Sequence, residues 1–145
     1  MRRIFLFSKM NQKKLSTHLV FLILFIFAVN YIAMKFYWYS TIWYFDMPMH
    51  FLGGFWVGLA LLWFFSLKEF SLPERLFGRA GFKIIFKIIL GIFLIGIFWE
   101  LFEVFVDKTI AQNSFNLLDT VSDMCFDLAG GGLSIIYFFK RIVYN

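Results

Sequence analysis

The chain has 145 residues and a formal net charge of +5; 61% of its residues are hydrophobic and 16% are charged. A soluble domain of this size buries only about two-thirds of the surface that its unfolded chain exposes, so it could not cover so much apolar surface. Lipid must therefore solvate much of the chain, and we interpret the positive charge as a sign of membrane topology, with no nucleic acid as a partner.

The first half contains two apolar stretches, each long enough for a transmembrane helix, which needs about 20 residues. We predict the first helix over residues 17–35, after a basic segment that resembles the start of a signal peptide. Its apolar run is too long for a cleavable signal and no small-residue cleavage pattern follows, so we expect it to stay as an anchor. We predict the second helix over residues 47–67.

The second half contains two more such stretches, which we predict to be helical over residues 84–106 and 119–139. Pro73 and Gly78 lie in the polar segment before the third helix and indicate a loop there. The sequence therefore predicts an all-α membrane protein, a bundle of four transmembrane helices that forms a single transmembrane domain over residues 1–145.

The basic residues predict the orientation of this bundle. Twelve of the 14 lysines and arginines lie before the first helix, around the loop after the second, or after the fourth; the other two are Lys35 and Lys108. Cytoplasmic segments carry such an excess, so we expect both the N-terminus and the C-terminus in the cytoplasm of a prokaryotic cell. The protein would be a multi-pass protein of the plasma (inner) membrane with membrane lipids as partners, and a homo-oligomer is compatible with this topology.

In this orientation the outward ends of the second, third and fourth helices bring together His50 and seven carboxyl groups: Asp46, Glu100, Glu103, Asp107, Asp119, Asp123 and Asp127. Within each helix these residues are three or four positions apart, and such residues are neighbours on a helix surface. An ionisable side chain inside the membrane costs several kcal/mol unless it has a partner. We therefore expect that several of these acids are protonated or that they share a cation.

Some of these residues also have a plain structural interpretation. Asp46 and Asp119 could cap the second and fourth helices, because Asp is a favoured N-cap residue. Asp107 could be a solvated charge at a helix end, and Glu103 could reach the interface. His50, Glu100, Asp123 and Asp127 are harder to explain in this way, because they lie about a turn or more inside apolar helices.

The order of these motifs resembles the YjdF-like family of bacterial inner-membrane proteins over roughly residues 46–132, and is more distantly similar to the VanZ-like proteins. The matching residues are Asp46-x3-His50-Phe51, Trp99-Glu100-x2-Glu103 and Asp119-Thr120-x2-Asp123, followed by glycines. The YjdF-like resemblance implies no activity, whereas the VanZ-like group is associated with resistance to glycopeptide antibiotics. The chain departs from the VanZ-like pattern in its second acid, Glu103, and in lacking an Arg before the last Asp.

One functional hypothesis is a site for a divalent metal (Mg, Mn, Ca or Zn) that acts on a lipid or a lipid-linked envelope molecule. Hard cations prefer carboxylate oxygens, and a bound metal can polarise a phosphoryl oxygen or activate water. Glu100 would be the catalytic general base. The metal ligands would come from Asp46, His50, Glu103, Asp119, Asp123 and Asp127.

Two other hypotheses stay open on the sequence alone, so the sequence does not decide whether the protein is an enzyme. The protein could be a non-catalytic envelope protein of the antibiotic-resistance type, whose acids bind a cation for stability or hold a partner. It could also be a proton- or cation-coupled carrier, in which Asp119, Asp123 and Asp127 form a relay that descends into the membrane.

Overall fold

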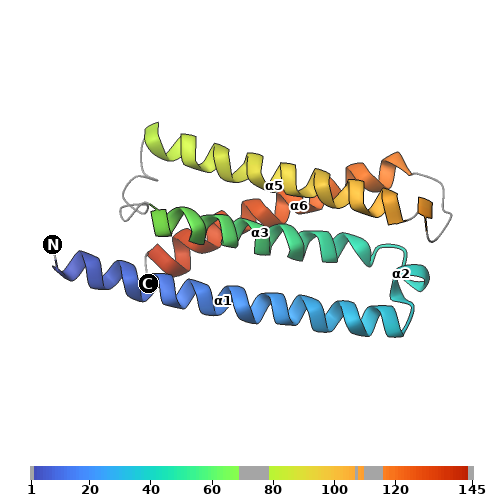
Figure 1. Cartoon of the computed structure of the whole chain (residues 1–145), viewed down its shortest axis with the longest axis horizontal. Helices are drawn as coiled ribbons and strands as arrows, with labels where there is room; N and C mark the ends of the chain where they lie inside the picture. Colours follow the sequence, from blue (N-terminus) through green and yellow to red (C-terminus); the bar gives the residue numbers. More distant parts are fainter. Residues whose placement is uncertain (1, 69–78, 107, 110–115, 144–145) are drawn as a thin grey trace.

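The computed structural model describes residues 2–68, 79–106, 108–109 and 116–143, and all regular structure in these ranges is helical. The elements are α1 (Arg2–Lys35), α2 (Trp38–Thr41), α3 (Asp46–Lys68), α5 (Arg79–Val106) and α6 (Leu117–Tyr137), followed by a π-helical turn, η2 (Phe138–Val143) (Figure 1). The all-helical fold is thus confirmed. Both α1 and α5 begin earlier than predicted, since lysine and arginine are good helix formers and continue each helix into its basic flank. The predicted loop with Pro73 and Gly78 lies outside the described residues.

Three of the described helices are long and apolar enough to cross a membrane, over Lys13–Lys35, Asp46–Phe65 and Gly81–Val106. At about 1.5 Å per residue, each can span a hydrocarbon core of about 30 Å. The fourth long helix, α6, has 21 residues but is less apolar, because it carries Asp119, Asp123 and Asp127. It is not among these three candidate spans, so its role as a fourth transmembrane helix stays a prediction.

The helices run antiparallel and bring the predicted acidic ends together. Figure 1 shows the start of α1, the end of α3, the start of α5 and the end of α6 at one end of the bundle. The start of α3, the end of α5 and the start of α6 lie at the other end. In this view α3 lies between α1 and α5, and α6 packs along α3.

Glycines allow α3 and α6 to pack with their backbones in close approach. A Cβ atom added to Gly54 of α3 would collide with the backbone of Asp127, and one added to Gly130 of α6 would collide with the carbonyl oxygen of Phe51. Small residues at a membrane helix interface permit such contact. The same contact sets the register between His50 on α3 and the aspartates on α6.

An apolar core fills the half of the bundle nearest the first residues of α1. It consists of Leu15, Leu19, Leu59, Leu62, Ile88, Ile92, Ile135 and Phe138. The indole Nε1 of Trp56 donates a hydrogen bond of 3.0 Å to the backbone oxygen of Leu19 and so ties α3 to α1. The polar side chains lie in the opposite half of the bundle.

The connection from α1 to α3 is a tight turn built on Tyr37, whose φ of 57° is in the left-handed region. The carbonyl oxygen of Tyr37 accepts the hydroxyl groups of Ser40 and Thr41 at 3.0 and 2.9 Å, which stabilises the turn. Trp43 just beyond it is 81% exposed, as expected of an aromatic ring at a membrane interface. The turn also brings Tyr39 back toward α1.

Candidate functional site

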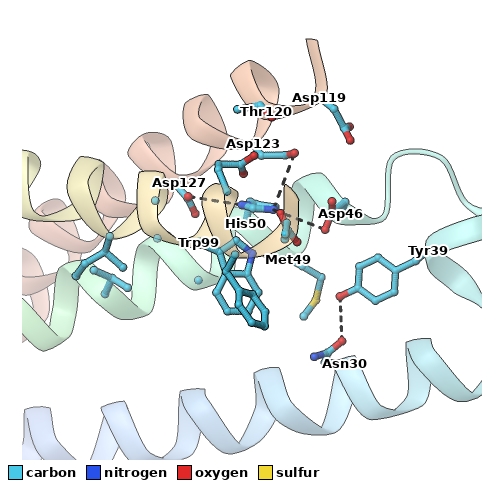
Figure 2. Close-up of a pocket in the computed structure, with 18 of the residues that line it drawn as sticks. Asn30, Tyr39, Asp46, Met49, His50, Trp99, Asp119, Thr120, Asp123 and Asp127 are labelled. Atoms are coloured by element: carbon cyan, nitrogen blue, oxygen red, sulfur yellow. Dashed lines mark hydrogen bonds and ion pairs between the residues drawn. The ribbon is translucent and has the colours of Figure 1, made fainter. Parts of the chain in front are cut away.

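His50 is the centre of the polar half of the bundle, and it is only 5% exposed. Its Nε2 atom lies 3.7 Å from Asp46 Oδ1, 3.8 Å from Glu103 Oε2 and 4.0 Å from Asp123 Oδ2. Its Nδ1 atom lies 3.5 Å from Asp127 Oδ2 on the other side of the ring (Figure 2). The two ring nitrogens therefore face different carboxyl groups, contributed by α3, α5 and α6.

The spacing on the Nε2 side suits atoms around a shared ion. Separations of 3.7–4.0 Å are longer than the 2.7–3.2 Å of an N–H···O hydrogen bond. Two ligand atoms that are each about 2.0–2.4 Å from one cation lie roughly 3–4 Å apart. The distances from Nε2 to these carboxylates are thus too long for direct hydrogen bonds and leave room for an ion between them.

Asp127 is placed to orient the imidazole. Metal-bound histidines usually donate their other N–H group to a carboxylate, which leaves the second nitrogen with its lone pair toward the metal. Asp127 Oδ2 is the carboxylate oxygen on the Nδ1 side of His50. Gly96 of α5 makes room for it, since a Cβ there would lie 2.9 Å from that same oxygen.

Two carboxyl groups in the cluster are both deeply buried and incompletely bonded. Glu100 is 7% exposed and Asp123 is 3% exposed. Within the described ranges, Glu100 Oε1 and Asp123 Oδ1 have no hydrogen-bond partner. A buried polar atom without a partner is costly, by about 1–3 kcal/mol and more when it is charged. These oxygens therefore need a proton or a bound cation.

The cluster contains two overlapping groups that could hold a metal ion. One is Asp46, His50 and Glu103, and the other is His50, Glu100 and Asp123; in each, the ligand atoms lie within 4.8 Å of one another. His50 is shared, so the two groups describe the two sides of one centre. Among the residues that the structure describes, His50 is the only basic group within 4.0 Å of these carboxylates.

The structure brings six of the predicted residues together: Asp46, His50, Glu100, Glu103, Asp123 and Asp127. Asp119 is exposed in the first turn of α6 and belongs to neither group. The helix cap is Asn116, which accepts a hydrogen bond of 3.2 Å from the backbone N–H of Leu118, so the alternative that Asp119 caps this helix is wrong. Asp107 lies outside the described residues.

A cavity of about 1140 Å³ extends from this cluster toward α1, and two of its lining residues were missed at the sequence level. The hydroxyl of Tyr39 donates a hydrogen bond of 3.0 Å to Asn30 Oδ1 on α1 (Figure 2). Burial, with smaller contributions from the charges of Asp46 and Glu103, raises the pKa of Tyr39 to about 12 and keeps this donor protonated. The available signal was Asn30 itself, the one amide in an otherwise apolar helix segment.

Comparison with known families agrees with this architecture. A model of a family described as "Predicted membrane protein (DUF2238)" matches residues 3–143. The chain belongs to this family of predicted membrane proteins. Searches of curated proteins and of solved structures found no match to the chain.

The residue types in the cluster favour a particular class of cation and also supply proton acceptors. One imidazole and several carboxylates favour a hard or borderline divalent cation over one that prefers sulfur ligands. Acids that do not bind the ion can accept a proton from water or from a substrate hydroxyl. A cavity of about 1140 Å³ adjoins this centre and leaves room for a ligand beside it.

Proposed function

We propose that this membrane protein binds one divalent cation at the His50 cluster and uses it to act on a lipid or a lipid-linked envelope molecule. The observation that carries the proposal is the pair of buried, unpartnered oxygens, Glu100 Oε1 and Asp123 Oδ1, beside a histidine. Such oxygens in an apolar bundle need either a proton or a cation. A cation bound by Asp123 accounts for one of these oxygens and for the other carboxylates around Nε2, and Glu100 Oε1 is left free to accept a proton.

Each residue has a defined part in this proposal. His50 Nε2 and Asp123 bind the ion, and Asp46 and Glu103 move closer to complete the ligand set, because each of these three carboxylates lies within 4.0 Å of Nε2. Asp127 holds the ring through Nδ1. Glu100, adjacent to this set, accepts the proton as general base. When bound, the ion polarises a phosphoryl oxygen or lowers the pKa of a bound water.

The many carboxylates and the single imidazole favour Mg²⁺ or Mn²⁺ over Zn²⁺, which usually takes more histidine or cysteine ligands. We place the centre at the outer face of the plasma membrane, with both chain ends in the cytoplasm. The bias of lysine and arginine supports this orientation. A reporter that is active only outside the cytoplasm, fused after Asn145, should stay silent; activity would reverse the orientation.

The polar side chains of the described helices gather at one end of the bundle, which argues against a carrier pathway through it. The buried acids of α6 end at Asp127, and beyond it Ile135 and Phe138 pack into the apolar core. The buried hydroxyl of Ser134 bonds back to the carbonyl of Gly131 in its own helix. Within the described helices, the polar groups therefore do not continue as a relay toward the other end.

The first experiment is elemental analysis of purified protein, which should show one divalent metal per chain. His50→Ala and Asp123→Asn should each lose it, because they remove ligands from opposite helices. Asp119→Asn is the matched control: it removes a carboxyl from the same helix as Asp123 but outside the ligand set, so metal should be retained. A wild-type protein without metal, purified in metal-supplemented buffer, would refute the centre.

An assay for turnover distinguishes the hypothesis of an enzyme from that of a non-catalytic metal-binding protein. Glu100→Gln should keep the metal and lose the release of product from membrane lipid extracts, since it removes the base and leaves the ligands. A Glu100→Gln variant with full activity would remove this residue from the chemistry. A wild-type protein that holds metal and changes no lipid would assign the ion a structural role.

A further inference from the structure

The cavity beside the cluster has an apolar part that the metal centre alone does not explain. Its apolar walls are Ile23 and Ile26 of α1, Ile92 and Ile95 of α5 and Val57 of α3. Ile23 and Ile95 line the cavity and yet are 40% and 45% exposed, so the cavity is open between α1 and α5. Both residues lie in helices that are long and apolar enough to cross a membrane, which places this opening at the level of the hydrocarbon once the bundle is in a bilayer. A lipid can therefore enter from the bilayer with its acyl chain first.

The size of the cavity fits an amphiphile rather than a bare ion. Its volume of about 1140 Å³ slightly exceeds the roughly 300–1,000 Å³ of pockets that enclose small organic ligands. The polar wall includes Asn30, whose Oδ1 is occupied by the Tyr39 hydroxyl. The amide Nδ2 of Asn30 is left as a hydrogen-bond donor for a head group.

The charge of the lining selects among head groups. Six carboxyl groups line the cavity, those of Asp46, Glu100, Glu103, Asp119, Asp123 and Asp127. The basic residues in this lining are Lys108 and His50. A divalent ion and Lys108 together supply three positive charges, so carboxylates remain in excess. A purely anionic head group would add to that repulsion, whereas an ammonium group would relieve it.

We infer that the cavity receives an aminophospholipid. Its acyl chain lies between α1 and α5, its phosphate meets the bound cation, and its ammonium pairs with the surplus carboxylates, of which exposed Asp119 is the most accessible. A primary ammonium offers three donors to these acids, whereas a quaternary amine offers none. The inference rests on the proposed function for the phosphate contact and names the substrate class of that site.

The test is native mass spectrometry of delipidated, metal-loaded protein mixed with equal amounts of phosphatidylethanolamine, phosphatidylcholine and phosphatidylglycerol. We expect about a tenfold preference for phosphatidylethanolamine, equivalent to about 1.4 kcal/mol. Asp119→Asn should reduce this preference and leave the metal content unchanged. Equal retention of all three lipids, or a preference for phosphatidylglycerol, would overturn the inference.

A second pair of variants tests the position of the lipid's acyl chain. Ile95→Trp fills the apolar wall and should lower the retention of every lipid without loss of metal. Phe98→Trp is the control on the same helix, since Phe98 is 71% exposed and outside the cavity lining. Lipid binding that survives Ile95→Trp would refute this location. Wild-type protein that takes up no metal and still selects phosphatidylethanolamine would refute the metal centre and keep the amine site, so the two failures can be told apart.

Discussion

Replacement of Gly54 by alanine should both destabilise the bundle and disturb the metal centre. The new Cβ would lie within 2.6 Å of the Cα and carbonyl carbon of Asp127 and closer still to its carbonyl oxygen. Carbon atoms in contact prefer about 3.5–4.0 Å, and backbone atoms cannot rotate away, so α3 and α6 must separate by on the order of 1 Å. Overpacking of this kind costs about 1–3 kcal/mol, and the better helix propensity of alanine offsets up to about 1 kcal/mol.

The net expectation is a loss of up to about 2 kcal/mol in the free energy of unfolding relative to wild type, and of about 1–3 kcal/mol relative to Gly132→Ala, measured by reversible unfolding in detergent. The separation also lengthens the 3.5 Å contact between His50 and Asp127, so metal content should fall in the same variant. Gly132→Ala is the matched control, because its Cβ would meet nothing within 4 Å and only helix propensity changes. If Gly54→Ala unfolds like Gly132→Ala and keeps its metal, close packing does not hold the centre in place.

Three further variants test single contacts in the fold. Trp56→Phe removes the hydrogen bond to Leu19 and should cost about 0.5–1.5 kcal/mol in the free energy of unfolding. Trp43→Phe is the control and should change little, because Trp43 is exposed. Equal effects of the two substitutions would contradict a role for this hydrogen bond. Asn116→Ala removes the cap of α6 and should cost about 1 kcal/mol, with recovery in Asn116→Asp; an unchanged midpoint for Asn116→Ala would argue against the cap. Because Tyr39 keeps its proton in the folded state until about pH 12, against an ordinary pKa of 10.0, stability should fall as pH rises from 10 to 12. Tyr39→Phe should remove that part of the alkaline loss, and identical pH profiles for the two proteins would refute it.

Local patterns in the sequence were sufficient for the existence of the four long helices and for the gathering of His50 with several acids. Apolar runs of about 20 residues predict membrane helices whatever their neighbours are. The three- and four-residue spacing of the acids follows directly from helix geometry, so Asp46 and His50 had to share a face. Antiparallel succession of the helices then placed the acids at one end. These properties depend on contacts near in sequence, or on the lipid solvent, and need no knowledge of packing.

Only the tertiary structure decided which acid faces which nitrogen of His50 and which acid stays outside the cluster. The rotation of α6 against α3 places Asp127 at Nδ1 of His50 and Asp123 near Nε2, and leaves Asp119 exposed, although all three follow the same four-residue spacing. That rotation depends on contact between the backbones at Gly54 and Asp127, far apart in the chain. The pairing of Asn30 with Tyr39, and the cavity between α1 and α5, likewise arise from helices that meet only in three dimensions.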